Sequence, residues 1–285
     1  MKITCLGTGS PESHKRRASS GYLVEVGGDS ILLDCGGGVV DRLIQSDRMP
    51  SDVTHVFFTH LHSDHMMDYA RLVHAAWDEA GTCPEVWGPE PIGEITERLF
   101  GKKGVFAADL VARTEFPGSQ EVWLGRGGSL PRPWPNPKVT EIAPGFAFST
   151  GNWSLTTCFV PHVQPYLVSL AIRIEANGKS VVYSGDAGLC PQMEELARNA
   201  DLLLHWCYRL SHERHYPCVT SLSPSPDEIS RMAERIGVKQ LVLTHLRKYM
   251  DSVGNHELIR DELSRYFSGR SQIAEDLMVF DLEGG

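Results

Sequence analysis

The sequence predicts an α/β protein built as a four-layer αββα sandwich, with helices on the outer faces of two packed β-sheets. Short apolar runs rich in β-branched residues fall into two series, one within the first 60 residues and the other from about residue 153 onward. Segments with apolar residues at helical spacing follow each series. Two series of strands, each followed by helices, are typical of two sheets that pack face to face and carry their helices outside.

The first series predicts four strands and a helix. The strands are expected at residues 2–6, 22–26, 31–34 and 53–59. The turn Gly27-Gly28-Asp29 joins the second and third strands as a hairpin. The fourth strand is largely apolar and β-branched, which is typical of a strand buried on both faces. Apolar residues then recur at helical spacing from Met66 to Trp77, so we expect a helix there.

The middle of the chain shows less regular patterning. Pro89-Glu90-Pro91 precedes a predicted helix over residues 92–100. From about 101 to 150 we expect an irregular insertion, because long segments without an apolar period are usually lids, binding loops or disordered. Two interpretations stay open for Trp123 and Trp134: they line the substrate entrance, or they pin the loop to the surface.

The second series predicts the remaining elements. Strands are expected at residues 153–160, 167–174, 180–184, 201–205, 239–244 and 277–282, and helices at 226–236 and 256–267. The dipeptide Asn177-Gly178 is a strong hairpin signal between the second and third of these strands. Ser225 is expected to open the first of the two helices.

Composition limits the classes of function. The chain has 27 basic and 36 acidic residues, a net charge of −9, which argues against a large nucleic-acid footprint. The seven cysteines are scattered without a C-x-x-C pair, which indicates free thiols in a reducing compartment. No stretch reaches the roughly 20 apolar residues that a membrane span needs. We therefore expect a soluble cytoplasmic protein that does not insert into a membrane.

The most informative segment is the histidine loop, Thr59-His60-Leu61-His62-Ser63-Asp64-His65. It places three imidazoles and a carboxylate within six residues, directly after the predicted buried strand. Each buried polar ring needs a partner, and four such groups crowded together indicate a shared cation. A rigid strand before the loop and a helix after it would hold these groups in place.

The loop resembles the H-x-H-x-D-H motif of the metallo-β-lactamase superfamily, which implies the αββα sandwich of that family. Three further residues that directly follow predicted strands match its remaining ligand positions: His162, Asp186 and His245. The resemblance implies one metal held by His60, His62 and His162, a second held by Asp64, His65 and His245, and Asp186 bridging both. Because these positions extend from His60 to His245, we expect one domain over residues 1–285.

Five nitrogens and two carboxylates favour two Zn²⁺ ions as cofactors, with Mn²⁺ or Fe as alternatives. Two cations about 3.5 to 4 Å apart would lower the pKa of a bridging water toward about 7 and present hydroxide to an electrophile.

Besides being a ligand, Asp64 is taken as a catalytic residue. Asp34 matches a position that orients a liganding histidine or the loop in the superfamily, and capping of the following helix is the alternative.

Three further segments resemble the RNase Z and arylsulfatase branch. They are Gly7-Thr8-Gly9-Ser10, Ser184-Gly185-Asp186 and Thr244-His245-Leu246. RNase Z carries a long tRNA-gripping arm between the lone histidine and the bridging aspartate. Here that interval is 186 − 162 = 24 residues, which a hairpin fills. A tRNA 3′-processing endonuclease, and nucleic acid as a partner, are therefore disfavoured.

A second departure concerns the general acid or base. The segments that resemble the H-S-T-like and H-E-A-T-like motifs of RNase Z are Ser223-Pro224-Ser225 and His205-Trp206-Cys207-Tyr208, which lack the histidine of the first and the glutamate of the second. His205 is taken as the catalytic group that replaces them, with His212 and His215 as alternatives. The loop over residues 209–225 is long enough to line a pocket, and Arg214 within it is a candidate to neutralise an anionic substrate.

These observations predict a dinuclear metal-dependent hydrolase in which a metal-bridging hydroxide attacks a small anionic ester, either a phosphodiester or an aryl sulfate. Hydrolysis of lactones or other carboxylic esters is the nearest alternative, because the same hydroxide attacks a carbonyl. A non-catalytic ligand-binding protein on this fold is a second alternative, against which the complete ligand set argues. Whether the chain forms a homodimer stays open.

Overall fold

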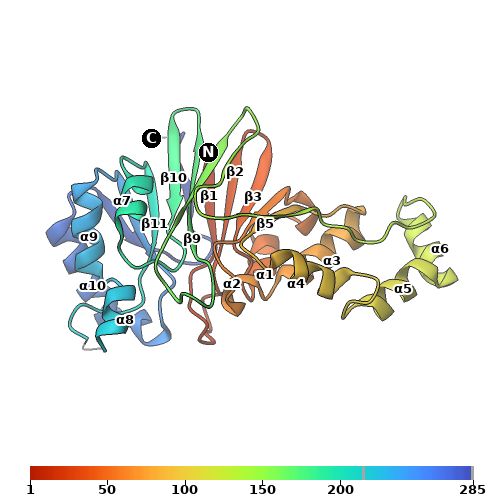
Figure 1. Cartoon of the computed structure of the whole chain (residues 1–285), viewed down its shortest axis with the longest axis horizontal. Coiled ribbons are helices and arrows are strands. Elements are labelled where there is room, and N and C mark those ends of the chain that lie inside the picture. Colours follow the sequence, from red (N-terminus) through yellow and green to blue (C-terminus); the bar gives the residue numbers. More distant parts are fainter. Residues whose placement is uncertain (214–215, 284–285) are drawn as a thin grey trace.

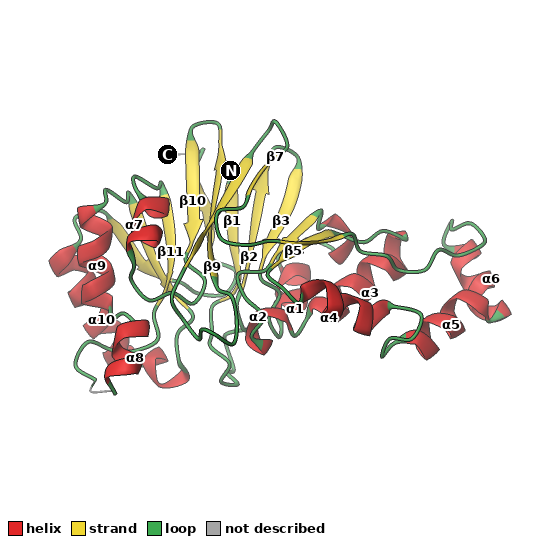
Figure 2. Ribbon diagram, in the orientation of Figure 1, coloured by secondary structure: helices red, strands yellow, loops and turns green. Residues whose placement is uncertain are grey.

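The computed structural model describes residues 1–213 and 216–283, and within these residues the chain forms two seven-stranded sheets that face each other. Helices cover the outer face of each sheet (Figure 1). The predicted αββα sandwich is therefore confirmed (Figure 2). Within the described part of the chain, no helix is both long and apolar enough to span a membrane.

The first sheet contains the strands of the amino-terminal series, two strands from the middle of the chain and one from the carboxyl end. In the order in which they lie side by side, they are β14 (Val279–Asp281), β1 (Lys2–Gly7), β2 (Gly21–Val26), β3 (Asp29–Leu33), β4 (His55–Phe57), β5 (Glu85–Gly88) and β6 (Val139–Glu141). Strands β3 to β6 run parallel to one another. The loops that follow β3 and β4 therefore leave the sheet at the same edge.

The second sheet contains the later series. Its order is β13 (Arg270–Ile273), β12 (Gln240–Thr244), β11 (Leu202–Trp206), β10 (Lys179–Tyr183), β9 (Leu170–Ala176), β8 (Ser154–Phe159) and β7 (Ala147–Ser149). Strands β10 to β13 are parallel. Three contacts join the two sheets where the parallel strands end: Leu170 N donates to Thr59 O at 3.0 Å, Tyr22 and Thr244 share a hydroxyl bond of 2.6 Å, and Tyr183 donates to Asp34 at 3.0 Å.

Three apolar clusters hold the layers together. One fills the space between the sheets and includes Phe57, Trp87 and Trp153. The second lies under α7 (Pro191–Ala197), α9 (Pro226–Arg235) and α10 (Val253–Tyr266). The third lies under α1 (Val39–Gln45), η1 (Pro50–Asp52), α3 (Tyr69–Ala80) and α4 (Ile92–Phe100). Three further short elements are the helices α2 (Ser63–Met66) and α8 (Pro217–Leu222) and the 3-10 helix η2 (Lys248–Asp251).

Residues 101–150 are less irregular than we expected. They contain α5 (Ala107–Glu115) and α6 (Pro117–Gly125), which project from one end of the molecule in Figure 1, and the edge strands β6 and β7. Each of the two helices buries a single residue and leaves apolar side chains exposed, among them Val111 of α5 and Val122 of α6. Without a one-sided apolar stripe, their sequence lacks the pattern that marks a packed helix.

The two tryptophans of this insertion bind backbone within or beside it. The indole of Trp123 donates to Ser129 O at 2.9 Å, and that of Trp134 donates to Phe100 O at 2.6 Å. Neither ring lines the cavity beside the candidate metal ligands. The structure thus supports pinning of the loop for both rings.

Candidate metal centre

The histidine loop is fixed by the carboxylate of Asp34, which directly follows β3. One oxygen accepts the Thr59 N–H at 2.8 Å, and the other accepts the Thr59 hydroxyl at 2.8 Å and lies 2.7 Å from His65 Nδ1. Asp34 is fully buried, whereas Gly38 occupies the N-cap of the next helix. Orientation of the loop and of His65, rather than helix capping, is therefore the role that its contacts support.

The loop packs closely on the segment after Asp34. A Cβ added at Gly36 would lie 2.0 Å from the carbonyl oxygen of Asp64, so this close approach requires glycine. The helix expected from Met66 onward is interrupted, because Asp68 N donates to Cys35 O at 3.0 Å and its carboxylate accepts the N–H groups of Gly38 and Val40. The result is a short α2 that carries two of the candidate ligands, followed by α3.

The first ligand group brings three imidazoles and a carboxylate to one point. Its members are His60, His62, His162 and Asp186, and one ligand atom from each lies within 4.8 Å of the others. His62 Nδ1 is 3.0 Å from His60 Nε2 and 3.3 Å from His162 Nε2. Two of these residues come from the loop after β4, and the others follow β8 and β10, so the parallel strand ends converge as expected.

The second ligand group consists of Asp64, His65 and His245, again within 4.8 Å of one another. His245 Nε2 is 3.1 Å from Asp64 Oδ2 and 3.3 Å from His65 Nε2. Asp186 lies between the two groups, since Oδ1 is 3.4 Å from His65 Nε2 and Oδ2 is 3.4 Å from His245 Nε2 and 3.7 Å from His162 Nε2. One carboxylate thus faces both groups.

Burial and neighbouring charges shift the pKa values of the candidate ligands in different directions. Burial lowers the pKa of His60 well below its usual value and that of His162 to about 4, so both rings are neutral at pH 7 and present a lone pair. Burial alone would raise the pKa of Asp186, but the imidazoles of His245 and His65 hold it well below its usual range. For His65, the Asp186 and Asp34 carboxylates outweigh burial and raise the pKa well above its usual value.

A buried carboxylate oxygen indicates whether a divalent cation fits this site. Asp186 Oδ1 is buried, makes no hydrogen bond among the described residues and lies 3.4 Å from His65 Nε2. An ionised oxygen in that position is costly unless a positive charge neutralises it. Together with the imidazole nitrogens of both groups, this oxygen forms a donor set that is appropriate for zinc and also accepts manganese or iron.

The structure does not bring His205 to this cluster. Its side chain is fully buried, Nδ1 lies 2.8 Å from Trp206 O, and it does not line the cavity beside the ligands. Adjacent residues of a strand point to opposite faces, so Trp206 faces the cavity and His205 faces away from it. Burial lowers the pKa of His205 to about 4, so the ring stays neutral at pH 7. A catalytic role for His205 fits this position poorly.

Of the alternatives to His205, His212 is exposed and does not line the cavity. His215 and Arg214, the candidate for charge neutralisation, lie outside the described residues.

A cavity of about 300 Å³ opens beside the ligands. Besides five of the ligands, it is lined by Pro11, Val163, Trp206, Tyr208, Cys218, Val219, Leu222 and Ser223. Three of these belong to α8, and Trp206 ends β11. The sequence predicted that residues 209–225 line a pocket, and Cys218, Val219, Leu222 and Ser223 do so. It did not predict Trp206, although the position of this residue at the end of a buried strand beside the His245 strand could have indicated it. The wall can accept an apolar or aromatic group next to the metal ligands.

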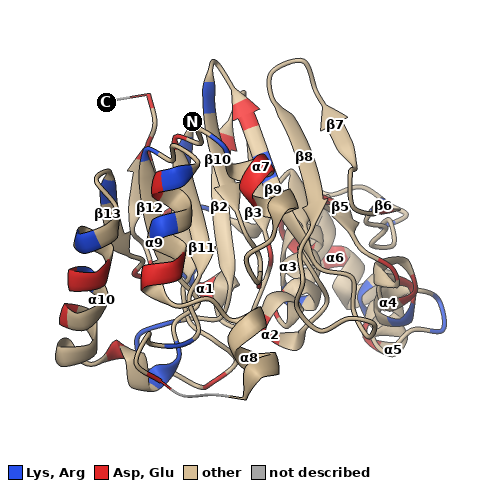
Figure 3. Cartoon of the chain, turned by 60° about the vertical axis from the view of Figure 1, so that its left-hand side comes forward, with Lys and Arg blue, Asp and Glu red and all other residues tan. Residues whose placement is uncertain are grey.

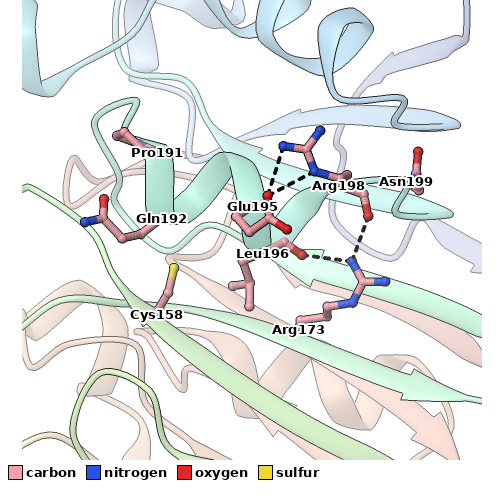
Figure 4. Close-up of a pocket in the computed structure, with 8 residues that line it drawn as sticks. All are labelled: Cys158, Arg173, Pro191, Gln192, Glu195, Leu196, Arg198 and Asn199. Atoms are coloured by element: carbon pink, nitrogen blue, oxygen red, sulfur yellow. Dashed lines mark hydrogen bonds and ion pairs between the residues drawn. The ribbon is translucent and has the colours of Figure 1, made fainter.

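A larger and more open hollow of about 760 Å³ lies against α7, beside β8 and β9. Its arginines already have partners: Arg173 donates to Leu196 O at 2.8 Å, and Arg198 pairs with Glu195 at 2.9 Å (Figure 4). None of the seven candidate ligands lines it. The smaller cavity is therefore the candidate active site.

The sequence and the structure of this chain were compared with those of known proteins. A family model described as "Beta-lactamase superfamily domain" matches residues 29–246. Ribonuclease Z of Mycobacterium bovis (strain BCG / Pasteur 1173P2) is 30% identical over 288 residues, covering 97% of this chain and 96% of the relative.

Among solved structures, the metallo-β-lactamase fold protein YhfI of Bacillus subtilis matches with a TM-score of 0.76 at 23% identity, covering 98% of each chain. The short form of human tRNase Z matches with a TM-score of 0.69 at 19% identity, covering 99% of each.

The sequence relative counts against one expectation. Its name, ribonuclease Z, denotes an enzyme of RNA, whereas the acidic net charge and the short interval before Asp186 led us to disfavour nucleic acid. A net charge averages over the whole surface, so it does not exclude a basic region where a polyanion could bind.

Proposed function

The chain belongs to the beta-lactamase superfamily and is a metal-dependent hydrolase that acts on ester bonds, and we therefore propose that it is a dinuclear phosphodiesterase. The observation that carries this proposal is the position of Asp186, whose carboxylate faces both ligand groups at 3.4 to 3.7 Å. Two cations held side by side and sharing one carboxylate are the arrangement used for in-line displacement at phosphorus.

Each part of the site has a distinct task in this proposal. His60, His62 and His162 would hold one cation, Asp64, His65 and His245 the other, and Asp186 both. Bound divalent cations lower the pKa of an adjacent water molecule and polarise the substrate's phosphoryl oxygen. Asp34 keeps the His65 ring in place through the 2.7 Å contact at Nδ1. The apolar wall of Val163, Trp206 and Leu222 would position the organic part of the ester and exclude water.

We favour a small diester with an aryl or other apolar group. Within the described residues, no lysine or arginine lines the 300 Å³ cavity, and its wall beyond the ligands is mainly apolar. A substrate would thus gain binding energy from an apolar group, while its charge is met by the cations. Aryl sulfates meet the same requirements.

A second candidate, cleavage of RNA at the 3′ side of tRNA, rests on the name of the sequence relative and on one feature of the insertion. Residues 101–138 carry six basic and three acidic side chains, a net charge of 6 − 3 = +3, in a chain whose net charge is −9. Lysine and arginine positions, blue on the ribbon, lie near α4 and α5 in Figure 3. A basic projection on an acidic protein can contact a polyanion that is too large for the cavity.

The test measures bound metal first and turnover second. Purified protein is expected to contain Zn²⁺ or another divalent cation and to hydrolyse bis(p-nitrophenyl) phosphate faster than p-nitrophenyl sulfate or a lactone. Chelator should abolish turnover, added metal should restore it, and Asp186→Asn should lack it. Cleavage of a pre-tRNA with a 3′ trailer, without diester turnover, would instead establish the second candidate. Metal-replete protein that cleaves none of these substrates would refute both.

A further inference from the structure

The indole of Trp206 fixes the tautomer of His245. Its N–H donates to His245 Nδ1 at 3.2 Å. An indole nitrogen can only donate, so Nδ1 must present its lone pair. A neutral imidazole then carries its proton on Nε2, which lies 3.1 Å from Asp64 Oδ2. Both contacts agree on the same tautomer, with a proton on the nitrogen that faces the ligand group.

Metal binding requires the opposite tautomer. In the second ligand group, Nε2 is the atom of His245 that faces Asp64 and His65. A neutral ring that ligates through Nε2 carries its proton on Nδ1, and this N–H would point at the indole N–H of Trp206 from 3.2 Å away. Trp206 and His245 are 3% and 1% exposed, so bulk water does not separate the two donors.

The other histidine of the same group shows the usual arrangement. His65 Nδ1 lies 2.7 Å from a carboxylate oxygen of Asp34, which can accept its proton when Nε2 ligates. In the first group, His60 Nδ1 lies 3.0 Å from the hydroxyl of Thr59, which can also accept. Ligating histidines nearly always donate their second N–H to an acceptor, and loss of that partner typically costs 10- to 100-fold in metal affinity. His245 faces a donor instead.

We propose that Trp206 weakens the second metal position, so that the protein holds one cation tightly at His60, His62, His162 and Asp186 and a second one loosely at Asp64, His65 and His245. The inference rests on the proposed dinuclear function. Trp206 acts through His245 and is therefore a positioning residue. Occupancy of the second position, and with it the activity, then depends on the concentration of free metal.

The experiment removes the donor and keeps an aromatic ring. In wild-type protein, titration with Zn²⁺ against a chromophoric chelator is expected to show two affinities. Trp206→Phe should raise the weaker affinity about 10-fold and leave the stronger one unchanged. With Co²⁺, the absorption of the second site should appear at correspondingly lower metal concentration. Trp206→Leu provides a second variant without a donor if the first does not fold.

Two further variants separate tautomer control from general effects. Tyr208→Phe changes another ring of the same wall, which lies 5.9 Å from the His245 ring between centroids but donates no hydrogen bond to it, and should leave both affinities unchanged. Asp34→Asn replaces the carboxylate with a neutral amide that has one acceptor oxygen in place of the two that Thr59 and His65 use, and should weaken the second position. Equal affinities in the wild type, or no gain in folded Trp206 variants, would overturn the proposal for Trp206 alone. A wild-type protein that binds no metal at all would overturn the proposed function as well.

Discussion

The two halves of the candidate metal centre are built in different ways. The amino-terminal half supplies four candidate ligands from one loop of six residues, His60 to His65, and the buried carboxylate of Asp34 holds that loop through its backbone and side chains. The carboxyl-terminal half supplies His162, Asp186 and His245 one at a time, each just after a separate strand of the second sheet. The first half is a local motif, whereas the second exists only once the sheet has formed.

The residues of the cavity wall are also divided unequally between the amino-terminal and carboxyl-terminal halves of the centre. Apart from Pro11, the residues that line it without being candidate ligands come from position 163 onward. The loop half therefore provides chemistry that relatives with the same motif can share, and the sheet half combines ligands with the surface that contacts the substrate. Changes at the wall residues of the sheet half should alter substrate choice, while changes at ligands of either half should alter metal binding and the turnover that depends on it.

The largest expected effect tests whether both halves serve one centre. His62→Ala and His162→Ala each remove one imidazole from the first ligand group, and their ligand nitrogens lie only 3.3 Å apart. We expect both variants to lose about 10³-fold in kcat/KM, because each weakens the same charge-stabilising cation. Bound metal and turnover of bis(p-nitrophenyl) phosphate are measured together. His212→Ala, an exposed histidine outside the cavity, serves as the control.

If His62→Ala lost turnover while His162→Ala kept normal metal content and turnover, the prediction would be wrong. His162, and with it the sheet half, would then not belong to the metal centre.

A smaller effect is expected at the cavity wall. Leu222 belongs to α8 and lines the cavity without belonging to a ligand group. Leu222→Ala should reduce kcat/KM for an aryl diester about 10-fold more than kcat/KM for dimethyl phosphate. The reason is that one methylene more or less in an apolar pocket changes kcat/KM between two substrates by about 10- to 200-fold. Leu124→Ala changes an exposed leucine of α6 and should leave the ratio unchanged. An equal loss for both diesters would show that the wall does not select the substrate.

The difference between the loop half and the sheet half also explains which parts of the site could be predicted from the sequence. The histidine loop can be read from spacing, because its four ligands lie within six residues. The role of Asp34, whose contacts reach 25 and 31 residues along the chain, was indicated only by the family resemblance. The placement of His162, Asp186 and His245 at one edge follows from parallel strands, whose carboxyl ends meet at the same side of a sheet. Strand and helix bounds were close for residues 92–100 and 226–236, where Pro and Ser mark the starts, and the structure has α4 at Ile92–Phe100 and α9 at Pro226–Arg235.

Features that depend on tertiary contacts were missed. Whether His205 or Trp206 faces the cavity depends on which side of β11 is covered by the other sheet, and a fully buried strand shows no alternation that would decide it. The helices α5 and α6 were missed because each buries one side chain. The segment 209–225 was expected to line a pocket, but its helix α8, which begins 217 − 205 = 12 residues after the last predicted strand position, was missed because the segment shows no helical pattern.

The smallest expected effect concerns the support of that wall. Ser225 caps α9 together with Glu228, whose carboxylate accepts the Ser225 N–H at 2.9 Å and a bond from Arg209 at 2.5 Å. Arg209 Nε in turn donates to the carbonyl of Ser223, a residue of the cavity wall, at 2.6 Å. Ser225→Ala should lower the free energy of unfolding by about 1 kcal/mol, the usual contribution of a serine N-cap.

Because this cap supports the wall and not the histidine loop, Ser225→Ala should raise KM for an aryl diester slightly and leave metal content unchanged. Urea unfolding of the metal-loaded protein gives the stability, and kinetics on the same preparation gives KM. Ser252→Ala removes the cap of α10, where the Ser252 hydroxyl accepts the Asn255 N–H at 3.3 Å, and should cost similar stability without changing KM. If Ser225→Ala lowered metal content, the sheet half could not be perturbed separately from the loop half, and the division drawn between them would be wrong.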